Sequence, residues 1–281
     1  MKKNVLIASL LSLAFSAQAQ SFTTLSGDVQ YRICRVGRSS KKVAERCYVR
    51  LLVSAKTQAG QKIFSENCWL SIGEEPAKNS FAGSLTMLSQ GDSAEFVMPA
   101  RIFLSGMLSY PRAKGAAAKD ALSVCVRVLR VVEPDIILDD DYEKFCAEYA
   151  AFESSVVKIY QRQHPNFKAA GDIWKNTERA GNGKKTSKYG DVMMIAYEGK
   201  FLNGVQFDAG AKAAAPFRYV RGQQWQVVQG MASALATMSE GEKAAFIMPS
   251  KVAFGAKGLA DIVPPFTPVV YEVEVVKVNV K

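Results

Sequence analysis

The residue types that usually carry acid, base, nucleophilic or metal chemistry are few in this chain of 281 residues. His164 is the single histidine, so the sequence does not offer the usual Ser/His/Asp set of a hydrolase. No two of the five cysteines have the C-x-x-C spacing that is typical of redox and zinc sites. We therefore expect neither a metal nor a cofactor.

The cysteines indicate disulfide chemistry instead. All lie in the first half of the chain, at Cys34, Cys47, Cys68, Cys125 and Cys146. In an oxidising compartment such a set usually forms disulfides, and here one thiol would be left over. Cys34 and Cys47 end the two arms of a basic loop. If those arms pair as a hairpin, the two residues would come within the Cα separation of about 4.4 to 6.8 Å that a disulfide needs.

The N-terminus has the charged, apolar and small-residue order of a secretory signal peptide. Lys2 and Lys3 precede an apolar run that ends at Phe15, and Ala17, Gln18 and Ala19 follow it. We expect cleavage after Ala19, removal of residues 1–19, and a periplasmic or secreted mature protein. No stretch reaches the about 20 apolar residues that cross a bilayer as a helix, so no membrane span is expected.

Composition places the chain among globular proteins. Apolar residues make up 48% and charged residues 22%, and the length suits two domains better than one. The formal net charge is +10, but the basic residues are scattered along the chain. A solvated basic surface is therefore favoured, and no nucleic-acid partner is expected.

An internal repeat sets the domain organisation. Phe81–Leu104 and Met231–Phe254 lie 150 residues apart and share the pattern S-x-G-[ED]-x-A-x-F-[IV]-M-P. Each copy continues into an alternating strand, which starts near Leu122 in the first copy and near Pro268 in the second. Two domains of one fold are implied.

Residues 136–163, between the two copies, have helical periodicity. Apolar residues recur there at steps of three and four, at Tyr142, Phe145, Tyr149, Phe152, Val156 and Ile159. Asp139 to Asp141 are N-cap candidates, and Pro165 marks the end. The stripe predicts either a connecting helix packed on its own domains or a homodimer contact through 142–160, because its average step also suits a short coiled coil.

The second copy carries an ordered series of motifs. They are GDVMMIAYEGKFLNGVQFDAG from Gly190, PFRYV from Pro216, VVQGM from Val227, LATMSEGEKAAFIMPS from Leu235, VAFGAKG from Val252 and IVPPFTPVVYEVEVVKV from Ile262. In this order and spacing they resemble the FKBP family of peptidyl-prolyl cis-trans isomerases over about Gly171 to Lys281. The resemblance implies an α+β fold in which an antiparallel sheet curls around one short helix, about Gln229 to Met238, with an apolar active-site pocket between them.

The resemblance also implies the chemistry and the site. Rotation about an X-Pro bond must overcome roughly 18 to 20 kcal/mol, because twisting removes the amide resonance, and a dry pocket favours the less polar twisted amide. Carried over by position, the catalytic residues are Tyr197, Asp208, Val228 and Phe254. The substrate-binding residues are Phe207, Phe217, Val227, Met231, Val263 and Tyr271. Asp208 would be buried and hydrogen-bonded to Tyr197, and the Val228 N–H would donate to a substrate carbonyl.

Two positions depart from the family pattern. Phe254 stands where the family usually has a tyrosine whose hydroxyl binds the substrate, which removes a hydrogen bond of about 0.5 to 1.5 kcal/mol. Met231 stands in place of the tryptophan floor. Because methionine is flexible and apolar, the resemblance implies a looser pocket and activity that is real but reduced.

The first copy lacks the Asp and most of the aromatics. Leu104 takes the place of Phe254, Phe64 or Ser65 that of Asp208, and Ile63 or Phe64 that of Phe207. Cys68 falls near the place of Phe217, and Cys125 takes that of Tyr271. Since those places face each other across the family's pocket, the resemblance implies a Cys68 to Cys125 bridge, with small buried thiols as the alternative.

The sequence therefore predicts a signal peptide at 1–19, a degenerate FKBP-like domain at 20–133, a connecting helix at 136–163 and an isomerase domain at 169–281. The leading hypothesis is a periplasmic proline isomerase acting on unfolded or proline-containing exported proteins. The alternative is a non-catalytic FKBP-like protein that binds clients or serves assembly.

Overall fold

The computed structural model describes residues 21–111, 116–133, 141–182, 187–260 and 262–279. The predicted signal peptide, its cleavage point and the N-cap candidates Asp139 and Asp140 lie outside the described residues. Within the described ranges, no helix is long and apolar enough to cross a membrane.

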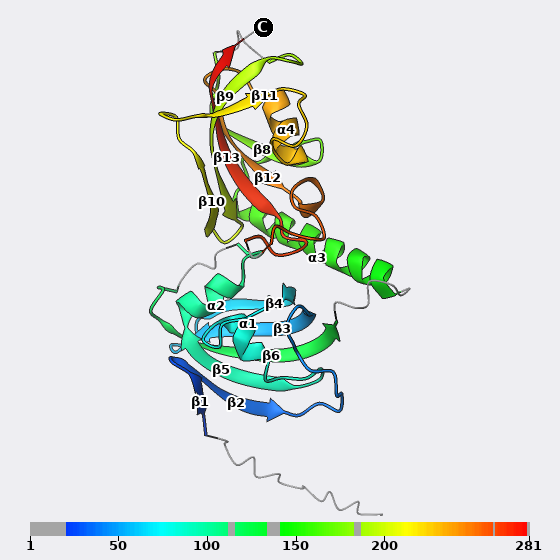
Figure 1. The fold of residues 1–281 in the computed structure, drawn as a ribbon. Helices are drawn as coiled ribbons and strands as arrows, with labels where there is room; N and C mark the ends of the chain where they lie inside the picture. The colour runs from blue at the N-terminus through cyan, green and yellow to red at the C-terminus, as the bar shows by residue number, and fades with distance from the viewer. Residues whose placement is uncertain (1–20, 112–115, 134–140, 183–186, 261, 280–281) are drawn as a thin grey trace, which may run out of the picture.

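The first half of the chain forms a six-stranded antiparallel sheet (Figure 1). Its elements in chain order are β1 (Thr23–Ser26), β2 (Val29–Arg35), β3 (Tyr48–Thr57), β4 (Lys62–Ser71), α1 (Phe81–Leu85), β5 (Ser93–Pro99), α2 (Ala100–Gly106) and β6 (Ala121–Val132). The strands lie in the order β1-β2-β5-β6-β3-β4.

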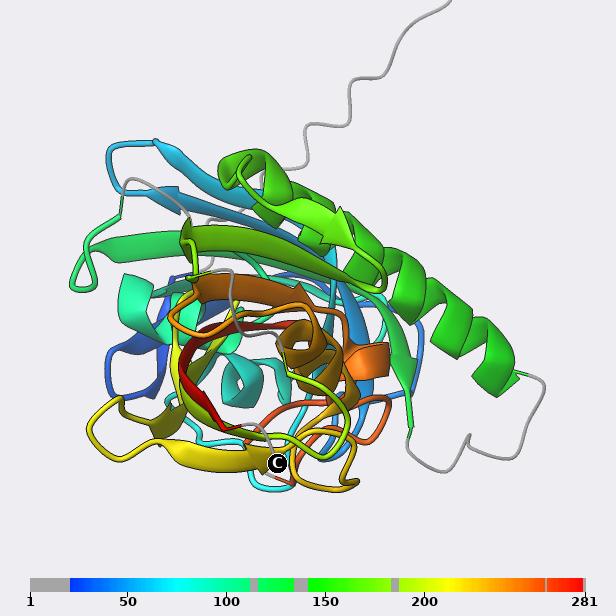
Figure 2. The same cartoon turned by 90° about the horizontal axis from the view of Figure 1, so that it is seen from above.

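A long helix and a second antiparallel sheet follow. The elements are α3 (Asp141–Gln163), β7 (Lys168–Ala170), β8 (Ile173–Arg179), β9 (Val192–Phe201), β10 (Gln206–Ala211), β11 (Phe217–Val220), α4 (Gln229–Ala236), β12 (Lys243–Met248), the short 3-10 helix η2 (Ser250–Val252) and β13 (Val269–Asn279). The strand order is β10-β9-β13-β12-β8-β7, with β11 also paired to β9. Viewed from above, α4 lies inside the curl of this sheet (Figure 2).

The two sheets have one topology, which confirms that the sequence repeat is a repeat of fold. Read from β7, the second order matches the first strand for strand. The register shift between Arg50 and Leu51 on β3 recurs between Met194 and Ile195 on β9. An α+β architecture with two related antiparallel sheets is therefore observed, as the sequence predicts.

The burial of the repeated strand differs between the copies. Along β5 buried and half-buried residues alternate, so one face is covered, whereas nearly every residue of β12 is buried. A strand that is buried on both faces reads as a continuous apolar run, as AAFIM does. On β12, Ala245 and Ile247 belong to the core cluster that contains the α3 stripe, while Ala244 and Phe246 belong to the inner core of the second sheet.

Helix α3 lies between the two sheets and packs against both (Figure 1). The Tyr149 ring stacks on Trp69 of β4, with centroids 5.7 Å apart, and on Phe266 of the second half, with centroids 4.7 Å apart. Phe145 lies 4.9 Å from Tyr48. The central stripe residues are buried within one chain: Phe145, Tyr149, Phe152 and Val156. This burial supports the alternative of a connecting helix packed on its own domains, while a homodimer through 142–160 stays a prediction.

The predicted disulfides are wrong, since all five cysteines are free thiols in this structure. Cys68 on β4 and Cys125 on β6 are separated by β3, and two strand spacings of about 4.8 Å exceed the reach of a disulfide. Cys68 is buried and Cys125 is exposed, so they occupy opposite faces of the sheet. The arms of the basic loop do not pair, because β5 and β6 lie between β2 and β3, so Cys34 and Cys47 are not brought together either.

We predict that Tyr149→Ala lowers the free energy of unfolding by about 3 to 5 kcal/mol, because it removes a buried ring that contacts both halves. Urea denaturation of the full chain measures this change. Tyr189→Ala is the control, since Tyr189 is 85% exposed and its loss should change stability by less than about 0.5 kcal/mol. Equal effects of the two variants would contradict the packing role of α3.

Candidate active site

A pocket opens on the second sheet, between the N-terminus of α4, the strands β9, β10 and β13, and the turn after η2. Its volume is about 620 Å³. Eight of the predicted site residues line it: Tyr197, Phe207, Asp208, Val227, Val228, Met231, Phe254 and Tyr271. Phe217 lies behind Tyr197, with ring centroids 6.1 Å apart, and Val263 is fully buried in the inner core. The geometry thus brings the predicted set together, while the role of each residue stays a prediction.

The aromatic wall depends on a glycine. Gly199 of β9 pairs with Tyr271 of β13 on one side and Asp208 of β10 on the other. A Cβ at Gly199 would lie 2.7 Å from the Phe207 ring, closer than real Cβ contacts allow, and 3.0 Å from the Tyr271 ring, which is tighter than most such contacts. With glycine there, the Phe207 and Tyr271 rings approach edge to face at 5.7 Å.

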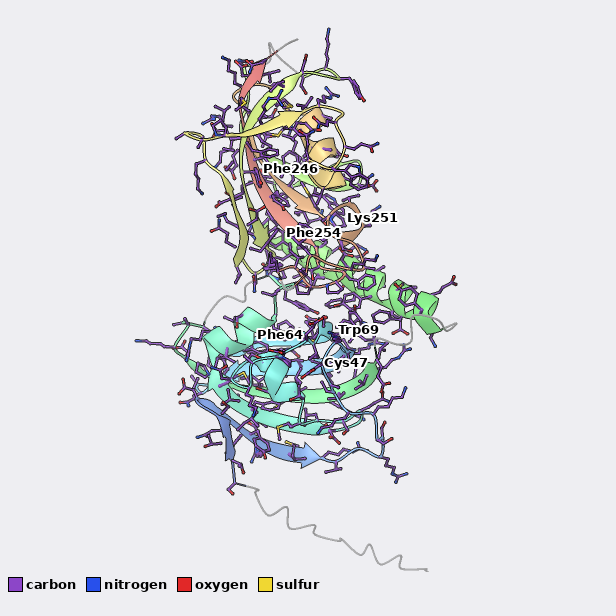
Figure 3. The ribbon with its side chains drawn as sticks, in the orientation of Figure 1. Cys47, Phe64, Trp69, Phe246, Lys251 and Phe254 are labelled. Carbon is purple, nitrogen blue, oxygen red and sulfur yellow. The ribbon has the colours of Figure 1, made fainter. Side chains whose placement is uncertain are left out.

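Phe254 closes the wall on the opposite side. Its ring meets that of Phe207 at 5.9 Å and 86°. Phe254 follows η2 and is only half-buried, as is Phe207, so both present apolar surface to the pocket. Figure 3 labels Phe254 on the turn that faces α3. The site can therefore desolvate an apolar ring such as that of proline.

Asp208 differs from the prediction in two respects. It is half-buried rather than buried, and its Oδ1 accepts a hydrogen bond from the Gly210 N–H at 2.8 Å. Among the described residues, no hydrogen bond joins Asp208 to Tyr197. The irregular pairing of β10 with β9 on either side of Asp208 folds Gly210 back toward the carboxylate. The hydrogen bond that the prediction gave to the Tyr197 hydroxyl is therefore made by the backbone of the local turn.

Asp208 still acts on the two tyrosines through its charge. Burial raises the pKa of the Tyr271 hydroxyl, and the negative charge of Asp208 raises it further. The pKa of Tyr197 is raised by the same two causes in the same order. Both hydroxyls therefore stay protonated at neutral pH and can only donate or accept hydrogen bonds.

The N-terminus of α4 supplies the polar contact that the prediction requires. Val228 is the N-cap residue, and no side chain caps the helix, whereas Ser80 caps α1 in the first half through its hydroxyl. No described residue accepts a hydrogen bond from the Val228 N–H. Met231, one turn further along, is 1% exposed and forms the pocket floor. A free donor thus stands beside an apolar floor.

Three apolar residues at the pocket mouth escaped the sequence prediction. Trp225 is 96% exposed with φ at 65°, and Leu259 and Ile262 are also exposed. Trp225 could have been noticed as a large apolar residue in the polar stretch RGQQWQ, directly before the helix. Leu259 and Ile262 lie in a turn closed by a bridge between Leu259 and Val263, which their spacing does not signal.

The described residues of the first half place other side chains at the positions of this pocket. Phe96 pairs with Val124 as Phe246 pairs with Tyr271, so Val124, and not Cys125 as predicted, takes the place of Tyr271. Ala55 pairs with Phe64 as Gly199 pairs with Asp208, so Phe64 occupies the carboxylate position.

Tyr110 fills the remaining space in the first half. Its ring lies 4.7 Å from Phe64, and its hydroxyl donates to the Asn67 carbonyl at 3.0 Å. Burial raises the pKa of Tyr110. An aromatic plug therefore stands where the second half has an open pocket.

The fold and the site together define an α+β protein with an apolar, aromatic pocket suited to an extended peptide. Residues 183–276 match the FKBP-type peptidyl-prolyl cis-trans isomerase family. FK506-binding protein 1 of Candida glabrata is 35% identical over 99 residues, which cover 35% of this chain and 86% of that protein. The peptidyl-prolyl cis-trans isomerase FKBP2 of Mus musculus is 35% identical over 33% of this chain and 66% of its own. The chain belongs to the FKBP family and is a peptidyl-prolyl cis-trans isomerase of the FKBP type.

A peptidyl-prolyl cis-trans isomerase of Pseudomonas syringae pv. tomato is 28% identical and covers 44% of this chain and 90% of its own, with a TM-score of 0.38. The three FKBP domains of wheat FKBP73 are 18% identical and cover 92% of this chain and 99% of theirs, with a TM-score of 0.36.

We predict opposite effects for two substitutions in the pocket. Phe254→Tyr should raise kcat/KM for a proline peptide about two- to tenfold, because it adds one hydrogen-bonding hydroxyl. Asp208→Ala should lower it by about the same factor, because it removes the charge beside Tyr197 and Tyr271. A protease-coupled isomerisation assay measures both, with urea denaturation to confirm folding. Unchanged rates in both variants would show that this pocket is not the catalytic site.

Proposed function

We propose that the chain is an exported isomerase that turns X-Pro bonds in unfolded client proteins within the pocket around Phe207, Phe254 and Tyr271. The observation that carries this proposal is the combination of aromatic walls, an apolar Met231 floor and the free Val228 N–H. Each has a separate part in binding a proline and the carbonyl next to it.

The mechanism follows from the polarity of the amide. The planar X-Pro amide is stabilised by charge-separated resonance that water solvates well, and the twisted state has lost this resonance. An apolar site therefore destabilises the planar form relative to the twisted one. The Val228 N–H would hold a substrate carbonyl while the proline ring rests on Met231. Residues of this chain need transfer no proton, because rotation breaks no covalent bond.

Catalysis is assigned to the second half alone, with a domain at 169–281 and a non-catalytic domain at 20–133. The plug of Phe64 and Tyr110 supports this division, because it occupies the space in which a proline would bind. The first domain is then left with a role in binding or assembly. A non-catalytic client-binding protein, the alternative function, would use the same pocket without accelerating rotation.

A matched pair of variants tests this division in the full chain. Phe254→Ala should lower kcat/KM about tenfold or more, because it removes one apolar wall. Leu104→Ala is its control, since Leu104 stands at the same position of the repeat and is also half-buried. Equal losses in the two variants would contradict the assignment of catalysis to the second half. Wild-type protein that gave no acceleration would favour the client-binding alternative.

The proposed location is the bacterial periplasm, reached by cleavage after Ala19. The charged, apolar and small-residue order of residues 1–19 supports this proposal. When the full-length chain is expressed in a Gram-negative bacterium, osmotic shock should release a protein whose N-terminal sequence begins at Gln20. An uncleaved chain retained in the cytoplasmic fraction would contradict export.

A further inference from the structure

Glu153 is a buried carboxylate at the centre of α3 whose hydrogen bonds run to the other half of the molecule. Its side chain is 7% exposed, and its two oxygens accept hydrogen bonds from the backbone N–H and from the hydroxyl of Ser250, the latter at 2.7 Å. Burial raises the pKa of Glu153, and the bonds from Ser250 and the Lys251 charge oppose that rise. Burying a carboxylate costs free energy unless hydrogen-bond or charged partners replace the water that it loses.

Ser250 controls the turn that carries Phe254. It begins η2, and its carbonyl accepts hydrogen bonds from the N–H groups of Ala253 at 2.9 Å and Gly255 at 2.7 Å. Phe254 lies between these two donors, so its backbone is held relative to Ser250. Figure 3 places Lys251 and Phe254 together on this turn, next to α3.

The repeat shows that this connection is particular to the second half. Ala100 stands at the position of Ser250, and its N–H donates at 2.7 Å to the carbonyl of Asp120, within the first half itself. In the first half the acceptor for this N–H is therefore a backbone carbonyl directly before β6. In the second half the acceptor comes from α3, which lies outside the residues 183–276 that match the family.

We infer that Glu153 is a positioning residue for the isomerase pocket, which sets the Phe254 wall through Ser250 and makes catalysis in the second half depend on helix α3. The inference rests on the proposed catalytic role of the pocket. It assigns α3 a part in the activity as well as in packing, since moving the helix would move the η2 turn with it.

Four variants of the full chain test the inference. Glu153→Leu removes both acceptors and should lower kcat/KM about tenfold, because small displacements of catalytic groups have large effects on rate. Glu153→Gln keeps an acceptor oxygen and should retain most of the activity. Ser250→Ala removes only the hydroxyl bond and should give a smaller loss. Glu153→Leu combined with Ser250→Ala should be no worse than Glu153→Leu alone, because both act through one connection.

Glu148→Leu is the matched control on the same helix. Glu148 forms ion pairs with Arg50 and Arg130 of the first sheet, at 3.5 and 3.3 Å, and within the described part of the chain it makes no hydrogen bond or ion pair with η2. It should leave kcat/KM unchanged even where urea denaturation reports lower stability. An equal loss of activity in Glu148→Leu and Glu153→Leu would mean general loosening and overturn the inference.

The inference and the proposed function fail in different ways. Wild-type kcat/KM in folded Glu153→Leu, together with a large loss in Phe254→Ala, would overturn the positioning role and leave the pocket as the catalytic site. Unchanged activity in Phe254→Ala would overturn the proposed pocket itself. If Glu153→Leu does not fold, the other two single variants decide the question. Lower kcat/KM in Ser250→Ala, with most of the activity retained in Glu153→Gln, supports the inference. Wild-type kcat/KM in Ser250→Ala overturns it.

Discussion

The aromatic stripe of α3 faces both halves of the molecule, and burying it away from water requires side chains from each half. The way the two halves pack against each other follows from this burial. Tyr149 is stacked between Trp69 of the first half and Phe266 of the second. The outer face of β12 packs against the core that contains the α3 stripe. For this reason β12 is buried on both faces, whereas β5 is buried on one face. A long helix with an apolar stripe therefore joins the cores of the two sheets, and Glu153 adds a polar connection at the same interface.

One topology supports an open pocket in the second half and a filled one in the first, and the difference comes from a few positions in matched registers. Gly199 leaves room for Phe207 and Tyr271, whereas Ala55 at the same register faces Phe64. Tyr110 then packs on Phe64 and bonds to the backbone of β4. Because protein interiors are close-packed, a ring that enters such a space excludes a ligand from it. In the described residues of the first half, the same fold thus carries aromatic side chains at the place of the pocket.

The pocket itself combines an apolar surface with few polar groups. Val228 is the N-cap residue of α4, and no described residue accepts a hydrogen bond from its backbone N–H, so one donor is left free beside the pocket floor. The carboxylate of Asp208 accepts a hydrogen bond from its own turn, and burial, followed by the Asp208 charge, raises the pKa values of Tyr197 and Tyr271. Such a site suits a reaction in which an amide is twisted and no bond is broken. The exposed Trp225 at its mouth extends the apolar surface beside the pocket.

The sequence by itself determined the repeated α+β fold, the helix between the copies, the family and eight of the residues that line the pocket, because local periodicity and motif order carry that information. It did not determine which partners those residues have. Disulfide pairing failed because the order of strands, a non-local property, puts β3 between Cys68 and Cys125. A slip of one residue assigned Cys125 to the place held by Val124, and in a strand one residue reverses the face. The coverage of the α3 stripe within one chain, the Gly210 bond of Asp208 and the bond from Ser250 to Glu153 join segments whose approach only the tertiary packing decides.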